Sequence, residues 1–332
     1  MGLKKKSLKW LISVLLLVVS MGCSDSTSKR MGFELSGDLG VHDPVMIKEE
    51  KLWHIYYTGV GIKHKISSDG VNWKDSESVF YQKPEWLSTY VPRVRESMWA
   101  PDIVYYNDYY YLTYSSSMFG KNTSVIGMAR NKTLNPDAVE YKWKDQGPII
   151  WSKGDDDYNC IDSNIVLDDQ GKPWLSFGSS FSGIKLVALD RNTLKPVENA
   201  EVFAIAARPV GEVIEAPYIV AHEGFYYLFV SFDFCCRKTE STYKIKVGRS
   251  KNITGPYADK EGKPMMNGGG TLIDAGNERW KGPGHCAVYV YDKKTFLVNH
   301  AYDAENTGTA TLQIRRLSWD DGGWPTIATE IP

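Results

Sequence analysis

The segment Asp102-Ile-Val-Tyr-Tyr-Asn-Asp-Tyr-Tyr-Tyr-Leu-Thr-Tyr-Ser115 places two short apolar stretches on either side of an Asn-Asp turn. Alternating apolar and aromatic residues around such a turn are typical of a β-hairpin. Related segments begin at Asp43, Asp162, Glu215 and His285, so that successive starts are 59, 60, 53 and 70 residues apart. These intervals predict five copies of one supersecondary unit.

A third strand-like segment follows each hairpin, at residues 62–67, 124–129, 184–189, 243–249 and 311–317. A fourth follows in several copies, for example at residues 71–73 and 142–143. Five four-stranded meanders predict an all-β fold, a five-bladed β-propeller with four-stranded antiparallel blades. A β-sandwich with leftover sequence is the alternative, but the in-phase copies fill nearly the whole chain. No linker rich in Pro, Gly or Ser separates them, so residues 35–332 are expected to form a single propeller domain.

The composition narrows the class of ligand. The 332 residues include 39 basic and 40 acidic side chains, for a net charge of −1. This balance argues against a nucleic-acid-binding protein, which needs a basic surface to neutralise phosphates. The 20 Tyr and 11 Trp residues suit β-strands and a stacking surface for a ligand such as a sugar.

The N-terminus resembles an export signal. Lys4, Lys5, Lys6 and Lys9 precede an apolar stretch at residues 10–19, which is shorter than the ~20 residues that a membrane-spanning helix needs. Because Gly22 precedes Cys23, we interpret residues 1–23 as a lipoprotein-type signal peptide and 24–34 as a polar tether. The alternative is a plain secretory signal with an incidental cysteine. We therefore expect a protein lipid-anchored in a bacterial envelope or at the cell surface, or else secreted or periplasmic.

Four further cysteines are Cys160, Cys235, Cys236 and Cys286. Their spacing fits no zinc motif, because two of them are adjacent. Adjacent cysteines bridge each other only through an eight-membered ring, so we expect no conventional disulfide framework. Whether Cys235 and Cys236 are bridged is left open by the sequence.

The repeat also places the ionisable residues. The first strand of each propeller blade lines the central axis, so Asp43, Asp102, Asp162, Glu215 and His285 are expected to converge there. Such a cluster in a cavity is the usual pattern of a functional site. Paired carboxyl groups suit glycoside cleavage, in which one acid protonates the departing oxygen and one base activates water. A third carboxylate can keep the acid protonated through like-charge repulsion. The candidate stacking faces are Trp53, Trp99, Phe119, Trp151, Phe181 and Trp280.

Several motifs carry a family resemblance. They are Val41-His-Asp-Pro44, Met98-Trp-Ala-Pro-Asp102, Ile161-Asp-Ser-Asn164, Phe177-Gly-Ser-Ser-Phe-Ser-Gly183, Glu215-Ala-Pro-Tyr218, Ser231-Phe-Asp-Phe-Cys-Cys-Arg237, Ser241-Thr-Tyr-Lys-Ile245 and Gly282-Pro-Gly-His285. With these motifs the chain resembles glycoside hydrolase family 43, and within it the arabinan endo-1,5-α-L-arabinosidases. The adjacent cysteines followed by Ser-Thr-Tyr-Lys-Ile make the resemblance specific.

The resemblance implies a role for each acid and a reaction, the inverting hydrolysis of α-1,5-linked L-arabinan. Asp43 would be the general base, Glu215 the general acid, and Asp162 would keep Glu215 protonated and in position. Asp102 matches no catalytic residue of the family, so its carboxylate is expected to be structural. His285 would help to bind an axial Ca²⁺ ion, mostly through water. The resemblance implies substrate contacts at Gly120, Asn159, Cys160, Ile161, Ser179, Ser180 and Phe181, and Trp99 and Phe119 are added to them as stacking candidates.

Two rival functions remain open. One is an exo-acting arabinanase, arabinofuranosidase or β-xylosidase of the same family, because sequence alone does not show whether a loop closes one end of the groove. The other is a non-catalytic carbohydrate-binding propeller, against which the three carboxyl groups argue. The expected partner is arabinan or an arabino-oligosaccharide, with no nucleic acid, membrane contact only through the N-terminal lipid, and a monomeric state.

Overall fold

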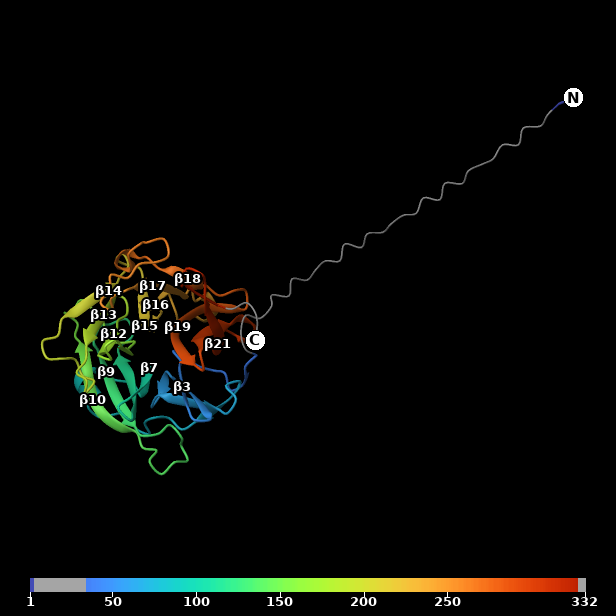
Figure 1. Cartoon of the computed structure of the whole chain (residues 1–332). Helices are drawn as coiled ribbons and strands as arrows, with labels where there is room; N and C mark the ends of the chain where they lie inside the picture. Colours follow the sequence, from blue (N-terminus) through green and yellow to red (C-terminus); the bar gives the residue numbers. More distant parts are fainter. Residues whose placement is uncertain (3–33, 328–332) are drawn as a thin grey trace.

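The computed structural model describes residues 1–2 and 34–327, and its strands form five sheets arranged around a central axis (Figure 1). This confirms the predicted all-β five-bladed propeller. Apart from residues 1–2 and Glu34, the predicted signal peptide and tether lie outside the described residues. Among the described residues, no helix combines the length and the apolar character that crossing a membrane requires.

Each blade is a meander of four strands. The first strands are β2 (Val45–Glu49), β7 (Ser97–Tyr106), β11 (Asn164–Leu167), β15 (Ile214–His222) and β19 (Trp280–Tyr291). The second strands are β3 (Leu52–Tyr57), β8 (Tyr109–Ser117), β12 (Pro173–Phe177), β16 (Phe225–Phe232) and β20 (Lys294–Asp303). The third strands are β5 (Lys63–Ser67), β9 (Ser124–Asn131), β13 (Ile184–Ala188), β17 (Lys244–Ser250) and β21 (Thr309–Trp319). The outer strands are β6 (Asn72–Ser76), β10 (Lys144–Ser152), β14 (Val202–Ala206), β18 (Thr271–Asp274) and β22 (Pro325–Ile327).

The first strands surround the axis. Each contacts the first strand of the next blade, in the closed order β2, β7, β11, β15, β19 and back to β2. The ring is closed by the segment ahead of β2, because the Val41 N–H donates to the Ala310 carbonyl at 3.1 Å and the Leu312 N–H to the Leu39 carbonyl at 2.8 Å. The expected inner-strand residues are therefore brought to one region of the molecule.

Two blades depart from the four-stranded prediction. Strand β1 (Ser36–Gly37) pairs in parallel with β6, and β4 (Gly59–Val60) pairs antiparallel with β7, so that two of the sheets have a fifth, short strand. The outer strand expected at residues 142–143 begins at Lys144 instead. The short helices are α1 (Leu87–Tyr90), η1 (Lys238–Glu240), η2 (Met265–Asn267) and η3 (Ala304–Asn306).

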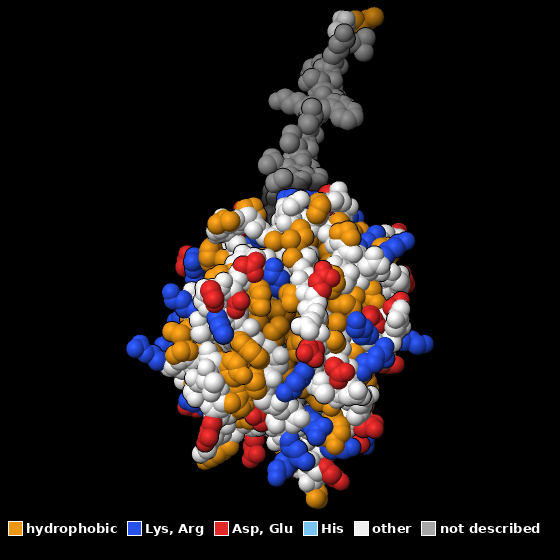
Figure 2. All heavy atoms as spheres, turned by 90° about the vertical axis from the view of Figure 1, so that its left-hand side faces the viewer, with side chains coloured by type: hydrophobic (Ala, Val, Ile, Leu, Met, Phe, Trp, Pro, Cys, Tyr) orange, Lys and Arg blue, Asp and Glu red, His pale blue; other side chains and the backbone are white. Residues whose placement is uncertain are grey.

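The hydrophobic core lies between the blades. Each pair of neighbouring blades encloses one cluster of buried side chains, for example Tyr56 of β3 with Leu112 of β8, and Leu186 of β13 with Leu228 of β16. Alternate residues of a strand point to opposite faces of its sheet, so one blade serves two clusters. On the face shown in Figure 2, basic and acidic side chains are interspersed, in keeping with the balanced net charge.

Candidate active site

The five blades share a backbone feature at the start of the inner strand. Asp43, Ala100, Asp162, Ala216 and His285 have left-handed φ angles of 52°, 46°, 60°, 55° and 48°. In three blades this residue falls where the pairing of the inner strand shifts register, which is the mark of a β-bulge. Non-glycine residues adopt this conformation at a cost and concentrate at functional sites.

This register corrects the sequence prediction, which treated Asp102 and Glu215 as equivalent to Asp43. Asp102 lies two residues beyond the left-handed position of its blade, and Glu215 lies one residue before it. A sequence signal existed, because a proline directly follows Asp43, Ala100 and Ala216. Alignment on those prolines would have given the observed register.

Asp102 has the structural role that was expected of it. Its buried carboxylate accepts hydrogen bonds from the Ile165 N–H at 2.8 Å and the Asn164 amide at 3.2 Å, both on the neighbouring β11. Asn164 makes the equivalent contact between the third and fourth blades, because its side-chain oxygen accepts a hydrogen bond from the Ile219 N–H of β15 at 2.9 Å. Burial raises the pKa of Asp102 to about 6, although these donors oppose the shift. Asp102 therefore ties inner strands together and does not face the cleft.

The N–H of each left-handed residue donates to a side chain of the preceding blade. In four cases the accepting side chain lies on the second strand of that blade or directly after it. The donor–acceptor distances are 2.8 Å from Ala100 to Thr58, 3.1 Å from Asp162 to Ser115, 2.8 Å from His285 to Ser231 and 3.1 Å from Asp43 to His300. The corresponding position of the third blade is Gly178, whose N–H bonds to the Ile161 carbonyl.

Gly178 has no side chain to offer, and the Ala216 N–H donates instead to Oδ2 of Asp162 at 3.2 Å. A Cβ atom at Gly178 would lie 2.6 Å from the Gly183 carbonyl oxygen, so the backbone there leaves no room for one. The glycine thus explains why the Asp162 carboxylate is directed toward the blade that carries Glu215.

Asp43 stands among three imidazoles. Its Oδ1 lies 2.8 Å from Nδ1 of His42, 3.3 Å from Nδ1 of His285 and 3.8 Å from Nδ1 of His300. The Thr58 hydroxyl donates to Oδ2 at 2.6 Å. Burial alone would raise the pKa of Asp43, but the nearby imidazoles, His42 first, hold the pKa of this carboxyl far below its ordinary value.

The three imidazoles differ in charge. Burial lowers the pKa of His285 and lowers that of His300 well below the ordinary value, so both rings are neutral at pH 7. Burial also opposes the charged form of His42, yet the Asp43 carboxylate outweighs it and raises the pKa of His42. Of the three rings, His42 is therefore the one whose charged form the surroundings favour.

The opposite wall carries two carboxyl groups. Glu215 is half-buried, and it accepts hydrogen bonds from the Ser179 hydroxyl, at 2.6 Å to Oε2, and from the Tyr243 hydroxyl at Oε1. Asp162 is 6% exposed, and burial followed by repulsion from Glu215 and Asp43 raises its pKa well above the ordinary value. This wall therefore holds a proton at a pH at which Asp43 is ionised.

A cleft of about 840 Å³ joins the two walls, within the size range of small-molecule sites. Of the predicted substrate contacts, eight line it: Trp99, Phe119, Gly120, Asn159, Ile161, Ser179, Ser180 and Phe181. Asp43, Asp162, Glu215 and His285 line it as well. Phe119 is 81% exposed and Phe181 is 52% exposed, so both offer ring faces at the rim.

Cys160 is a correction to the predicted substrate contacts. Its side chain is fully buried in the core between the second and third blades, and its N–H donates to the Ser152 hydroxyl at 2.9 Å. Trp53, Trp151 and Trp280 also lie outside the residues that line the cleft, and pack instead against Tyr291, Tyr90 and Arg279 respectively.

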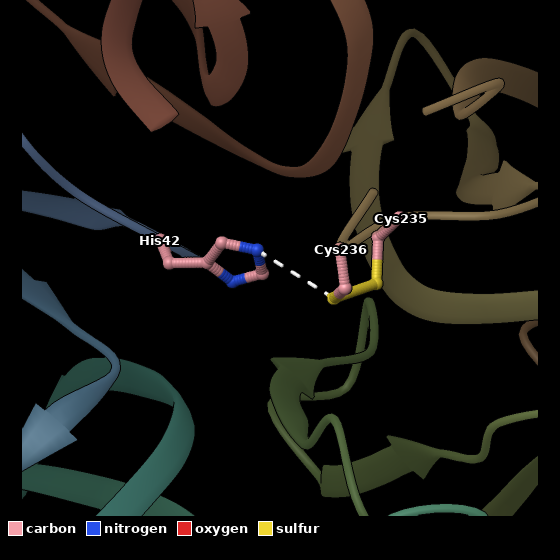
Figure 3. Close-up of side chains that lie close together, drawn as sticks. All are labelled: His42, Cys235 and Cys236. Carbon is pink, nitrogen blue, oxygen red and sulfur yellow. Dashed lines mark hydrogen bonds between the residues drawn. A yellow bond between two sulfur atoms is a disulfide. The ribbon is translucent and has the colours of Figure 1, made fainter. Parts of the chain in front are cut away.

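The sequence interpretation missed several residues of the site. His42, Thr58 and the buried Tyr243 contact the catalytic candidates, and five consecutive residues, 233–237, line the cleft together. Within this segment Cys235 and Cys236 form a disulfide with each other (Figure 3). Cys160 and Cys286 are free and buried. His42 and Tyr243 lie inside the quoted motifs, but no pattern in the sequence marks them as neighbours of the acids.

The residues around His285 suit calcium only as a largely hydrated ion. Calcium prefers oxygen ligands, and the group formed by His42, Asp43 and His300 offers two ring nitrogens for one carboxylate oxygen. Oδ1 of Asp43 is the carboxylate oxygen paired with His285. His285 could therefore contribute one ligand, and water would have to supply most of the others.

Comparison with known proteins identifies relatives across the whole propeller. An extracellular endo-α-(1→5)-L-arabinanase of Bacillus subtilis is 47% identical over 290 residues, covering 86% of this chain and 87% of the relative. An extracellular exo-α-(1→5)-L-arabinofuranosidase of Cellvibrio japonicus is 42% identical over 329 residues, covering 96% and 92%. A solved Cellvibrio cellulosa α-L-arabinanase in complex with arabinohexaose superposes with a TM-score of 0.85 at 44% identity, covering 87% of this chain and 96% of that one.

A solved endo-arabinanase of Bacillus licheniformis gives a TM-score of 0.83 at 49% identity, covering 89% of this chain and 99% of that one. Residues 38–325 match the family described as "Glycosyl hydrolases family 43". The match spans all five blades and both walls of the cleft, and the chain therefore belongs to glycosyl hydrolase family 43.

Proposed function

We propose that this protein hydrolyses α-1,5-linked L-arabinan by a single displacement that inverts the anomeric carbon. The observation that carries the proposal is the contrast between the two walls, an ionised Asp43 beside imidazoles on one and a proton-holding Asp162 next to Glu215 on the other. An inverting glycosidase requires two different carboxyl groups. An ionised base activates water on one face of the sugar, and a protonated acid donates to the leaving oxygen on the other.

Asp43 acts as the base. The pKa of Asp43 lies far below neutrality, so it is ionised over the whole physiological range, and the Thr58 hydroxyl fixes the carboxylate through Oδ2. A water molecule bound next to the Asp43 carboxylate transfers a proton to it while the water oxygen attacks the anomeric carbon. The His42 ring nitrogen lies 2.8 Å from the other carboxylate oxygen and sets its orientation.

Glu215 acts as the acid. It is half-buried and reaches the cleft, whereas Asp162 is 6% exposed and bonded to the Ala216 N–H. Ser179 and Tyr243 hold the two oxygens of Glu215, and when Glu215 is protonated one of these hydroxyls becomes the acceptor. Repulsion between Asp162 and Glu215 favours a wall that keeps a proton, and in this proposal Glu215 delivers it to the leaving oxygen.

The arabinan substrate is supported by the relatives. The Bacillus subtilis enzyme is named an endo-arabinanase, and the Cellvibrio cellulosa structure holds arabinohexaose. The ring faces of Trp99, Phe119 and Phe181 line the cleft, and they suit the apolar faces of successive sugar units. Release of reducing sugar from linear arabinan tests this proposal, and its absence at any pH would exclude the enzyme and favour a binding propeller.

Exo action is the second candidate, because the Cellvibrio japonicus relative at 42% identity is named an exo-arabinofuranosidase. Chromatography of linear arabinan digests over time separates the two modes. A spread of oligomers early in the reaction supports endo action, whereas one short product from the first minutes supports exo action. Xylan oligomers in the same assay test the β-xylosidase alternative.

We further propose a Ca²⁺ ion at the axis, with His285 as one ligand and water as the others. A bound cation near Asp43 would add positive charge and favour the ionised base. Elemental analysis of the purified protein tests for it, and His285→Ala should lower the metal content without unfolding the propeller. No stoichiometric metal, with full activity after prolonged chelation, would refute the proposal.

We also propose that the chain is exported and anchored through a lipid on Cys23. The signal-like N-terminus supports this, and the two curated relatives described above are named extracellular. Replacement of Cys23 by Ala should release the protein from the membrane fraction in the native host. An unchanged membrane fraction would contradict the anchor.

A further inference from the structure

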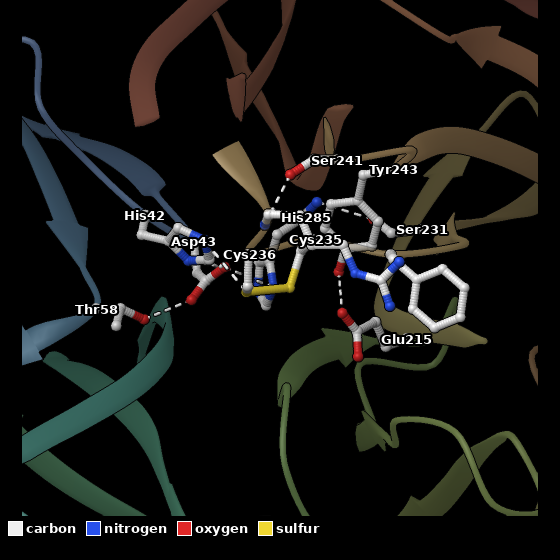
Figure 4. The surroundings of a disulfide bond; sticks show 12 residues. His42, Asp43, Thr58, Glu215, Ser231, Cys235, Cys236, Ser241, Tyr243 and His285 are labelled. Atoms are coloured by element: carbon white, nitrogen blue, oxygen red, sulfur yellow. Dashed lines mark hydrogen bonds and ion pairs between the residues drawn. A yellow bond between two sulfur atoms is a disulfide. The ribbon is translucent and has the colours of Figure 1, made fainter. Parts of the chain in front are cut away.

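The loop of residues 233–237, between β16 and η1, forms one continuous part of the cleft wall. All five of its residues line the cleft, although none of them was assigned a part in catalysis. At its centre stands the Cys235–Cys236 disulfide, with Cys235 half-buried and Cys236 exposed. Figure 4 places this disulfide between His42 and Asp43 on one side and Glu215 and Tyr243 on the other.

The loop is held in place from both ends. Asp233 pairs with Arg208 and with Lys244, each at 2.7 Å, and the Phe234 carbonyl accepts from the Thr242 and Tyr243 N–H groups at 2.9 and 3.2 Å. The N–H of Cys236 donates to the Tyr302 hydroxyl at 2.8 Å. These contacts fix the sulfur atoms relative to the two walls.

The backbone of the loop is strained at two positions. Asp233 and Cys236 adopt left-handed φ angles of 69° and 66°, although neither is a glycine. Such conformations persist only where the surroundings impose them, and they concentrate at functional sites. A loop that served only to join β16 to η1 would have no need of an exposed disulfide in this conformation.

The disulfide also adjoins the base. Sγ of Cys236 lies 3.8 Å from Nε2 of His42 (Figure 3), and the Tyr302 hydroxyl that accepts from Cys236 lies 2.9 Å from the same nitrogen. His42 in turn holds Asp43. A sugar ring that presents its anomeric carbon to Asp43 and its leaving oxygen to Glu215 therefore lies beside the two sulfur atoms.

We propose that the Cys235–Cys236 disulfide is a substrate-contacting surface, the rigid apolar wall against which the sugar ring rests at the point of cleavage. This rests on the proposed function, because it takes an arabinose ring as the occupant. Sulfur is polarisable and apolar, and it suits the C–H face of a furanose better than two hydrated thiols would. Phe234, which is 40% exposed, continues the apolar wall toward the rim.

Reduction should remove the wall. A small dithiol supplies two electrons and two protons, the S–S bond breaks to give two thiols, and the dithiol closes to its own disulfide. Turnover of linear arabinan by the reduced enzyme should show a KM raised about five- to tenfold, the loss expected for about one apolar contact. The Cys235→Ala/Cys236→Ala variant should match the reduced enzyme and should not respond to dithiol.

The direct test is protection of the disulfide by the sugar. The Asp43→Asn variant is incubated with dithiothreitol, with and without arabinohexaose at ten times its measured Kd, and newly exposed thiols are alkylated and located by mass spectrometry. If the sugar covers the sulfur atoms, reduction should slow about tenfold, because only about one-eleventh of the protein remains free. An oligosaccharide that calorimetry shows not to bind is the matched control.

An unchanged rate of reduction with the sugar bound would overturn this inference and leave the proposed function intact. Failure of calorimetry to detect any arabinohexaose binding would contradict the proposed substrate, and this inference with it. Alkylation confined to residues 235 and 236 confirms that the buried Cys160 and Cys286 do not contribute.

Discussion

The two walls of the cleft begin from the same backbone position but differ in chemistry. Asp43 and Asp162 both hold the left-handed position at the start of an inner strand, with φ angles of 52° and 60°. Imidazoles surround Asp43 and hold its pKa far below the ordinary value, whereas burial and the neighbouring carboxylates raise that of Asp162. One blade position thus yields a base or a proton-holding group, depending on which side chains surround it.

The largest effect should follow from loss of the base. Asp43→Ala leaves water without a proton acceptor, so kcat should fall by about 10²–10⁴, the range typical of general-base loss. Arabinohexaose binding, measured by calorimetry, should change little because the aromatic faces remain. Near-normal turnover in this variant would remove Asp43 from the mechanism.

Asp162→Asn tests the opposite wall. The like charge that favours retention of the proton on this wall is removed, so the proton should leave at lower pH. The basic limb of the kcat/KM profile should therefore move down by about one pH unit, with a loss of activity at pH 7. An unshifted basic limb with normal activity would show that Asp162 does not modulate the acid.

A smaller effect should follow from His42→Gln, which keeps a hydrogen-bonding side chain but removes the positive charge beside Asp43. The pKa of Asp43 should rise toward its ordinary value, so the acid limb of kcat/KM should move to higher pH, by about one unit. Thr58→Val is the matched control, because it removes a neutral hydrogen bond to the same carboxylate. Equal shifts in both variants would contradict a role for the His42 charge.

The last comparison concerns two histidines for which burial, and not a carboxylate, sets the pKa. His54 and His64 of the first blade are fully buried and bonded to each other at 3.0 Å, and burial lowers their pKa values to about 4 and about 3. The unfolded chain binds protons at these sites below about pH 6.5, before the folded chain does. Stability should therefore fall as the pH drops from about 6.5 toward 3.

The expected slope is up to about 1.4 kcal/mol per pH unit for each histidine. Chemical denaturation across this range measures it, with His54→Gln/His64→Gln as the variant that cannot titrate. If the variant and the unmodified protein lose stability in parallel, the buried pair is not the cause. If the slope of the variant is shallower, the buried pair is the cause of the lost stability.

The fold was predictable because its signal is repeated along the chain. Five hairpins with alternating apolar and aromatic residues, evenly spaced, leave few architectures other than a propeller. The three catalytic candidates followed from their place at the axis and from the family motifs. The register of Glu215 and Asp102 was not predicted, because the bulge moves side chains by one or two residues relative to a count from the hairpin.

Other features depended on contacts between distant segments. The contact of His42 with the Tyr302 hydroxyl joins the two ends of the propeller, and no local pattern encodes it. Cys160 was wrongly expected in the cleft because its neighbours Asn159 and Ile161 do line it, whereas its own side chain turns into the core. Residues next to each other on a turn can face opposite ways.

The central claim is that Asp43 and Glu215 act from opposite faces of the sugar. Proton NMR of the first product released from linear arabinan tests this most directly, because it reports the anomer before mutarotation. The account predicts that α-linked arabinose units are released first as the β-anomer, since water attacks from the face of Asp43. The α-anomer as the first product would contradict it, because retention requires a carboxylate that bonds to the sugar rather than one that activates water.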